Sequence, residues 1–314
     1  MSDKTLALFC PSIECKYPLI KLKNGYACTN PTCLHFNENE YFQTVEKKPV
    51  IISEKTCDTV CDANNIESYV KRPLVRFQVL KSFFIGENPT TIKNCLSFVK
   101  AVEKLSSSPK VLVIGSGEKG SGTEKLWASS KIQIHGVDIY SSEFVDVVCD
   151  AHYLPFESDS YDGVWIQAVL EHVVEPSKVV DEIYRVLKFD GVVYAETPFM
   201  QQVHEGAYDF TRFTVLGHRY LFKRFDVIQL GGLGGAEVVL AWSLRYFIWA
   251  ITRSRKISRL IGLFFGVIMR PFAAIISKKS LYDASSGVFF LGVKTLDNCV
   301  THKELIKLYK GQFK

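Results

Sequence analysis

The 314-residue sequence has no internal repeat and no low-complexity tract, and its first residues do not resemble a secretory signal. The start MSDKT contains an acid and leads into only a short apolar patch, whereas a signal peptide has a basic start and a longer apolar core. Further along, the apolar stretch Leu260 to Met269 is shorter than the about 20 residues that cross a bilayer, and Arg270 with Pro271 interrupts its continuation. We therefore expect a cytoplasmic protein.

The composition is neither that of a disordered chain nor that of a disulfide scaffold. Hydrophobic residues make up 47% of the sequence and aromatic residues 13%, which is ample for a packed core. The nine cysteines are expected to be thiols or metal ligands, because disulfides are rare in the cytoplasm. The length suits one large domain or two, at about 100 to 200 residues per domain.

Four of the cysteines form two pairs of equal spacing near the amino end, Cys10 with Cys15 and Cys28 with Cys33. Two turns that each offer two thiolates can hold one tetrahedral zinc ion in a small β unit. The C-x4-C spacing is wider than the commoner C-x2-C, so four buried cysteines without a metal are the alternative. We expect residues 1–53 to be a zinc-ribbon-like unit in which these four residues bind one structural zinc.

Residues 54–108 are expected to connect this unit to the main domain. The segment 54–72 is polar and partly acidic, which is typical of a linker or a surface helix. Apolar residues then recur at helical spacing over 76–105, with interruptions at Gly86 and Pro89. This pattern predicts two helices.

The main domain, residues 109–314, opens with a strand that runs into a glycine-rich turn. The run 111–114 is typical of a fully buried parallel strand, and Gly115, Gly117 and Gly120 follow it at once. Glycine lets a bound cofactor approach the backbone amides and the start of the next helix closely. Because such a pattern is common by chance, an ordinary strand-to-helix turn is the alternative to a site for a nucleotide-bearing cofactor.

Two acids mark the ends of the next two predicted strands. Asp138 ends the first of them, and its distance from the glycines suits a carboxylate that accepts both ribose hydroxyls of a nucleoside. Asp150 follows the run 145–148 and can accept a hydrogen bond from an adenine amino group. In a dinucleotide-binding fold the third strand would not normally supply an acid that binds adenine. The second acid therefore favours a cofactor other than a nicotinamide dinucleotide.

Together these segments resemble the class I S-adenosylmethionine-dependent methyltransferases, from about Lys110 to about Leu230. The resemblance implies an α/β fold with a Rossmann-like seven-stranded sheet, helices on both faces, and S-adenosyl-L-methionine as the cofactor. The matching segments are VLVIGSGEKG (111–120), Asp138, CDAHYLPF around Asp150, YDGVW (161–165), AVLEHV (168–173) and EIYRVLKFDGVVYAETP (182–198). The cofactor-binding residues expected from this resemblance are Gly115, Ser116, Gly117, Gly120, Asp138, Asp150, Ala151 and Gln167.

The sequence departs from the family pattern at the methionine end of the cofactor. The family commonly has an acid two residues before the first glycine, where this sequence has Val113, and the third glycine, Gly120, stands one position late. Glu118 is a candidate to replace the missing acid. The cysteine-bearing unit, for its part, looks like the small zinc ribbons that precede some methyltransferase domains.

A polar loop with the sequence HEGAYDFTRF, residues 204–213, follows the predicted fifth strand. Open α/β sheets bind ligands at the carboxyl ends of their strands, so we expect this loop to face the transferable methyl group. A hydroxyl acceptor needs a base, for which His204 is the first candidate, Asp209 the second and His172 the third. The alternative is that His–Glu and Asp–Arg pairs only hold the loop together. The loop resembles the segment found at this place in methyltransferases of polysaccharide-building pathways.

An insertion separates the predicted sixth strand, 225–230, from the seventh, 288–293. Its residues 238–282 include no acid, and they combine basic residues with aromatic and long apolar stretches. This composition suits peripheral contact with the inner face of an anionic membrane. We expect the insertion to emerge beside the His204 loop and to present a lipid-linked acceptor there. A helical cap or a dimer interface is the alternative.

The function that these observations predict is methyl transfer from S-adenosylmethionine to a small-molecule, glycan or lipid-linked acceptor, at a hydroxyl. An RNA methyltransferase with an N-terminal zinc ribbon is the alternative within the same chemistry. Nucleic acid is the less expected partner, because the basic residues lie within apolar stretches whereas an RNA-binding face would be mostly polar. A non-catalytic cofactor-binding scaffold is the third possibility, and Val113 alone supports it. The sequence predicts no oligomeric state.

Overall fold

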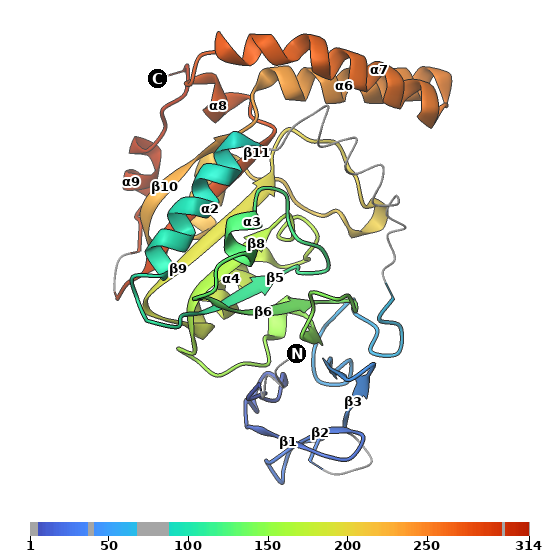
Figure 1. The fold of residues 1–314 in the computed structure, drawn as a ribbon, viewed down its shortest axis with the longest axis vertical. Helices are drawn as coiled ribbons and strands as arrows, with labels where there is room; N and C mark the ends of the chain where they lie inside the picture. The colour runs from blue at the N-terminus through green and yellow to red at the C-terminus, as the bar shows by residue number, and fades with distance from the viewer. Residues whose placement is uncertain (1–5, 37–40, 68–87, 297–298, 314) are drawn as a thin grey trace.

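The computed structural model describes residues 6–36, 41–67, 88–296 and 299–313. Their strands form one eleven-stranded sheet in the order β1-β2-β3-β4-β7-β6-β5-β8-β9-β11-β10, with helices packed against it (Figure 1). The expected α/β class is confirmed. The sheet is wider than the expected seven strands, because strands from the amino-terminal segment extend it.

The buried run that opens the main domain forms β5 (Lys110–Ile114) in the centre of the sheet. It lies between β6 (Gln133–Asp138) and β8 (Tyr161–Gln167), and all three strands are parallel. Parallel strands of this kind are covered on both faces, which explains the continuous apolar run. The other core strands are β7 (Val147–Cys149), β9 (Leu187–Pro198), β10 (Phe225–Leu233) and β11 (Gly287–Lys294), of which β11 is antiparallel to both β9 and β10.

The amino-terminal segment continues the main sheet through β4 (Lys48–Ile51). This strand pairs in parallel with β7, so β7 does not form an open edge whose backbone groups lack partners. The remaining strands of the segment are antiparallel and lie beyond β4 at the bottom of Figure 1; they are β1 (Leu19–Lys21), β2 (Gly25–Cys28) and β3 (Phe42–Val45).

Helices cover both faces of the core sheet, as the resemblance implied. On one face α4 (Pro176–Val186) packs Val179 and Ile183 into the cluster that contains Leu112 of β5. On the other face α2 (Pro89–Val102) packs Phe98 with Val111 and Trp165. The shorter helices are α3 (Glu124–Trp127), α5 (Val215–Leu221) and α9 (His302–Lys307).

Of the two helices predicted over 76–105, α2 is the second. Pro89 does not interrupt it but opens it, because a proline at the first helical position loses no hydrogen bond, and the Asn88 side chain caps the amide of Thr90. The first predicted helix falls within 68–87, outside the described residues, as does the end of the 54–72 linker. The described part of that linker, through Glu67, contains turns and no helix.

The insertion forms a hairpin of two helices, α6 (Ala236–Thr252) and α7 (Arg255–Met269). Figure 1 shows the two helices side by side at the top of the molecule, beyond the end of the sheet. Ala241 is the buried residue of α6 and Ser258 that of α7, so nearly the whole hairpin surface is open or half-open.

The α7 helix continues into η3 (Arg270–Ala274). The combined helix, Arg255–Ala274, has 20 residues and contains an 18-residue stretch with a mean hydropathy of 1.5, of which 6% is buried. By length and composition alone it could cross a membrane, which corrects the expectation that the stretch is too short. Pro271 does not break the helical path, because it stands in the first turn of η3 where its missing N–H is not needed. A short helix, α8 (Ser280–Asp283), then leads to β11.

Candidate cofactor and acceptor site

The glycine loop between β5 and α3 needs glycine for two reasons. One residue has a left-handed backbone conformation, and neighbouring side chains leave no room for a Cβ. Gly115 has φ +79°, and a Cβ there would lie 2.2 Å from Cγ2 of Val169. A Cβ at Gly120 would lie 2.1 Å from Oε1 of Gln167, so two of the predicted cofactor residues are in direct contact. Ser116 is fully buried and its backbone N–H and hydroxyl both donate to the carbonyl of Val137. The Ser116 side chain therefore fixes the loop to β6.

The acid at the end of β6 lies against this loop, where the sequence placed it. Oδ2 of Asp138 accepts from the backbone N–H of Gly117 at 2.7 Å, and Oδ1 accepts from that of Ile139 at 2.7 Å. Gly117 itself has no room for a side chain, since a Cβ would meet the Tyr140 hydroxyl at 2.2 Å. The Asp138 carboxylate thus stands beside the glycine amides that a nucleoside would approach.

Asp150 at the end of β7 is buried and already holds two partners. Its Oδ1 accepts from the backbone N–H of His152 at 2.9 Å and from Nδ1 of the same residue at 2.6 Å. Its Oδ2 accepts from the hydroxyl of Thr59, in the segment predicted as a linker. Burial opposes ionisation, but the hydrogen bonds and charge of His152 outweigh it and lower the pKa of Asp150. Ala151 follows as the first residue of η1 (Ala151–Tyr153), which Asp150 caps.

Glu196 of β9 is a half-buried acid near the glycine loop that the sequence analysis did not single out. Gln167 at the end of β8 donates to the Ser121 carbonyl at 3.2 Å and to Oε1 of Glu196 at 3.4 Å. Oε2 of Glu196 accepts from Thr91 of α2 at 3.0 Å and from Tyr194 at 2.7 Å. Burial raises the pKa of Glu196. Its place at the carboxyl end of a core strand was the signal that could have identified it.

Glu196 and Glu118, the candidate to replace the missing acid, differ in their contact with the glycine loop. Val113 is buried in the core on the α2 face and Glu118 is exposed. Gln167 links the Glu196 carboxylate to the loop through its hydrogen bonds to Ser121 and Glu196.

The loops after β8 and β9 meet at the same edge and bring His172 and His204 together. Their Nε2 atoms lie 3.1 Å apart. Glu171 Oε1 lies 3.6 Å from Nε2 of His172 and 4.0 Å from Nε2 of His204. The backbone carbonyl of Glu171 accepts from Phe210 N–H at 2.8 Å, which ties the two loops together. Two of the three predicted catalytic residues therefore converge on one point.

The third, Asp209, contacts His204 from the other side. Asp209 Oδ2 lies 3.2 Å from Nδ1 of His204 and accepts from its backbone N–H at 2.9 Å. Arg212 donates to both Asp209 oxygens, and its hydrogen bonds outweigh the effect of burial and lower the pKa of Asp209 to about 2. Asp209 is thus positioned to orient His204, and the Asp–Arg pair considered as the structural alternative is also present.

Glu171, directly before His172, was not predicted as a site residue. Its side chain is 1% exposed, and neither carboxylate oxygen makes a hydrogen bond to another described residue. Burial raises its pKa to about 8. An acid next to a candidate histidine was the sequence signal, but only the fold shows that its carboxylate is buried and accepts no hydrogen bond from another described residue.

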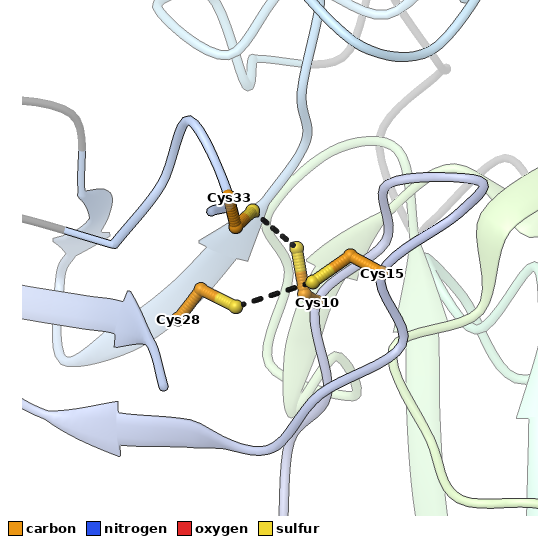
Figure 2. A group of neighbouring side chains, drawn as sticks. All are labelled: Cys10, Cys15, Cys28 and Cys33. Atoms are coloured by element: carbon orange, nitrogen blue, oxygen red, sulfur yellow. Dashed lines mark hydrogen bonds between the residues drawn. The ribbon is translucent and has the colours of Figure 1, made fainter. Parts of the chain in front are cut away.

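The four amino-terminal cysteines also converge, as predicted. Figure 2 shows their sulfur atoms pointing toward one centre, with Cys10 and Cys33 3.7 Å apart and Cys15 and Cys28 3.4 Å apart. All four sulfur atoms lie within 4.8 Å of one another. A disulfide would need about 2.05 Å, whereas four thiolates at about 2.3 Å from a zinc ion would be about 3.8 Å apart. The donor set and its spacing fit tetrahedral zinc.

Comparison with known protein families matches one part of the chain. Residues 112–195, from β5 to β9, match the family described as "Methyltransferase domain". The chain contains a class I S-adenosylmethionine-dependent methyltransferase domain. This methyltransferase domain carries the glycine loop, Asp138, Asp150 and the histidine His172.

A curated protein and several solved structures are similar to this chain. A demethylmenaquinone methyltransferase of Clavibacter sepedonicus is 49% identical over 67 residues, which is 20% of this chain and 26% of that enzyme. The chain thus matches about a quarter of the length of this curated relative.

Among solved structures, the Haemonchus contortus phosphoethanolamine N-methyltransferase 2, in complex with phosphomonomethylethanolamine and S-adenosylhomocysteine, is 19% identical. Its TM-score is 0.45, and the match covers 69% of this chain and 56% of the Haemonchus chain. An Archaeoglobus fulgidus S-adenosylmethionine-dependent methyltransferase is 15% identical, with a TM-score of 0.42, and covers 69% of this chain and 99% of its own.

Proposed function

We propose that this protein transfers the methyl group of S-adenosylmethionine to a hydroxyl of a small-molecule, glycan or lipid-linked acceptor. The observation that carries the proposal is the convergence of the imidazoles of His172 and His204 at the carboxyl edge of the sheet, the edge that also holds the glycine loop. A sulfonium methyl group is a strong electrophile, so the protein mainly has to align cofactor and acceptor.

A hydroxyl acceptor must lose its proton as it attacks. The oxygen–methyl bond forms, the methyl–sulfur bond breaks, and the hydroxyl proton passes to an imidazole or to solvent. Nδ1 of His172 is placed to donate to the Tyr208 carbonyl at 2.6 Å, which leaves Nε2 as its basic atom. Nδ1 of His204 faces Asp209 in the same way. The two Nε2 atoms lie 3.1 Å apart, and we propose that the acceptor hydroxyl binds beside them.

The proposed lipid-linked acceptor rests on contacts between the helical hairpin and the His204 loop. Tyr246 of α6 donates to the carbonyl of Val203 at 2.8 Å, and Gln202 donates to the Ser243 hydroxyl of α6 at 3.1 Å. These two contacts join α6 to the residues directly before His204. A substrate held by the hairpin would reach the histidines without leaving the membrane surface.

We propose an anionic membrane surface as the partner of the hairpin, which would place the protein at the inner face of a membrane. The hairpin exposes large apolar side chains, with Leu260 70% and Phe264 61% exposed. Nearby basic residues are also exposed and can meet anionic headgroups; they are Arg253, Arg255, Lys256, Arg259, Lys278 and Lys279. An RNA-binding face would not alternate with exposed Leu and Phe in this way.

We further propose that Cys10, Cys15, Cys28 and Cys33 hold one structural zinc ion. The ion would fasten the turn at residues 10–15 to the end of β2, in a unit with too few apolar residues for a core of its own. It would take no direct part in methyl transfer, since β5 and the cysteine unit lie in separate parts of the sheet.

The test of the function is transfer of a tritiated methyl group from labelled S-adenosylmethionine to a fractionated lysate, scored separately for lipid, glycan, RNA and protein. Label in the lipid or glycan fraction, at a bond stable to mild base, supports an ether at a hydroxyl. Label in RNA alone would favour the RNA alternative. Tight cofactor binding with no label in any fraction would favour the non-catalytic scaffold.

A further inference from the structure

Three potential metal-binding atoms converge in the acceptor site. Nε2 of His172, Nε2 of His204 and Oε1 of Glu171 are separated by 3.1, 3.6 and 4.0 Å. Ligands held at about 2.1 Å from a metal ion lie about 3.0 to 3.5 Å from one another. The two nitrogens already have this spacing, and the carboxylate oxygen needs a shift of about half an ångström.

The other nitrogen of each imidazole is engaged in the manner typical of metal-bound histidine. Nδ1 of His172 contacts the Tyr208 carbonyl at 2.6 Å, and Nδ1 of His204 contacts the Asp209 carboxylate at 3.2 Å. These contacts assign the protons to both Nδ1 atoms, so the lone pairs of the two Nε2 atoms face each other at 3.1 Å. Two facing lone pairs repel, and a cation between them turns the contact into an attraction.

Glu171 gives an independent reason for a ligand at this point. Its carboxylate is buried to 1% exposure, and neither oxygen makes a hydrogen bond to another described residue. Such burial is costly without a compensating partner. A cation held by the two imidazoles would supply that partner. Glu205 adds a further carboxylate, with Oε2 3.9 Å from Nε2 of His172.

We propose that Glu171, His172 and His204 bind one divalent transition-metal ion in the acceptor site. Two imidazoles with one carboxylate suit Mn²⁺, Fe²⁺, Co²⁺ or Zn²⁺ better than Mg²⁺ or Ca²⁺, which prefer oxygen ligands alone. Three protein ligands leave positions for an acceptor oxygen. The site is open for this, since the His204 side chain is 28% exposed.

The ion gives the histidines a second way to serve the proposed reaction, and in this respect the inference rests on the proposed function. A divalent cation lowers the pKa of a hydroxyl that it contacts, so the hydroxyl proton can pass to solvent while the oxygen–methyl bond forms and the methyl–sulfur bond breaks. The imidazoles then hold the ion in place of accepting the proton.

Binding of Mn²⁺ to the full-length chain, followed by electron paramagnetic resonance, tests the site directly. Mn²⁺ has little affinity for thiolates, so the four amino-terminal cysteines do not compete for it. We expect one Mn²⁺ per chain, with affinity at least tenfold lower in each of Glu171→Gln, His172→Ala and His204→Ala. The matched controls are Glu175→Gln and His302→Ala, which lie outside the cluster and should bind as the wild type does. Affinity for S-adenosylhomocysteine, measured on every variant, checks that the domain has folded.

The outcomes separate this proposal from the proposed function. No Mn²⁺ binding by the wild type, or binding that the three substitutions leave unchanged, overturns the metal site and leaves a proton shared by the two imidazoles as the explanation of their contact. Full methyl transfer after removal of the ion overturns its part in the reaction while the methyltransferase function stands. Mn²⁺ binding by this cluster with no transfer to any acceptor supports the metal site and counts against the function.

Discussion

The hydroxyl of Thr59 donates a hydrogen bond to the buried carboxylate of Asp150. Thr59 belongs to the segment that follows the cysteine unit, and Asp150 stands at the end of β7 where an adenine is expected. The backbone N–H of Asp58 also donates to the hydroxyl of Tyr153, three residues after Asp150, at 3.1 Å. The segment before the methyltransferase domain thus forms part of the wall of the proposed cofactor site.

The first prediction concerns the two acids. The purified protein should bind S-adenosylmethionine and S-adenosylhomocysteine but not nicotinamide dinucleotides. Asp138→Ala and Asp150→Ala should each weaken binding by about 1 to 3 kcal/mol, the cost of leaving buried donors without an acceptor. Asp150→Ala should also destabilise the fold, because Thr59 and His152 lose their acceptor. Calorimetry measures both effects.

The matched control for the acids is Asp181→Ala. The Asp181 side chain is 68% exposed and pairs only at the surface with Arg224. The Asp181→Ala substitution should leave the affinity for the cofactor and the stability of the fold unchanged. Affinity equal to the wild type in both the Asp138 and the Asp150 variants would show that the cofactor lies elsewhere.

The second prediction is one zinc ion bound by the four amino-terminal cysteines. Cys15→Ser and Cys28→Ser should each lower the zinc content, measured by mass spectrometry of the protein, by one equivalent. Cys299→Ser, at an exposed cysteine, should not. Removal of this ion should loosen residues 6–36 while S-adenosylhomocysteine still binds, because β4, β7 and β6 separate that unit from β5. A freshly purified, reduced sample without zinc would end this assignment.

The third prediction is that the protein floats with anionic liposomes and less so at high salt, which screens the basic residues. Leu260→Asp with Phe264→Asp should abolish flotation, because both side chains are exposed on α7 and would bring charge into the apolar layer. A chain without 238–282 should behave likewise. The control is Ile306→Asp, an exposed apolar residue of α9. If the wild type remains at the bottom of the gradient, as the chain without 238–282 does, the hairpin has another partner.

The fourth prediction is a loss of stability in mild acid caused by His218. This side chain of α5 is buried against Phe213 and Phe222, and neither ring nitrogen has a partner among the described residues. Burial lowers its pKa from 6.5 to about 3. Below about pH 6.5 the unfolded state therefore binds a proton that the folded state does not, so stability falls as the pH drops toward 3.

At pH 5 this effect costs about 2 kcal/mol relative to pH 7. Urea unfolding as a function of pH should show a shallower decline for His218→Phe than for the wild type. His302→Phe, at a histidine on the exposed start of α9, serves as the control. Parallel pH profiles of the wild type and His218→Phe would show that His218 ionises in the folded state.

The sequence by itself determined the core strands and the glycine loop. The run 111–114, the glycines after it and Asp138 are close in sequence, and their meaning depends on local rules of burial, backbone freedom and strand direction. The two cysteine pairs could be recognised for the same reason. These features can be recognised without knowing which distant segments of the chain come together in the fold.

Only the tertiary structure decided which distant residues share a site. Glu171 and His204 are separated by a whole strand, and Thr59 lies far before Asp150 in the sequence, so no spacing rule connects either pair. The parallel pairing of β4 with β7 likewise depends on an edge that exists only once the sheet has formed. Burial is also decided by the tertiary structure. A glutamate before a histidine is common in sequences. Glu171 becomes a candidate metal ligand because the fold excludes water from its carboxylate and brings two imidazoles close to it.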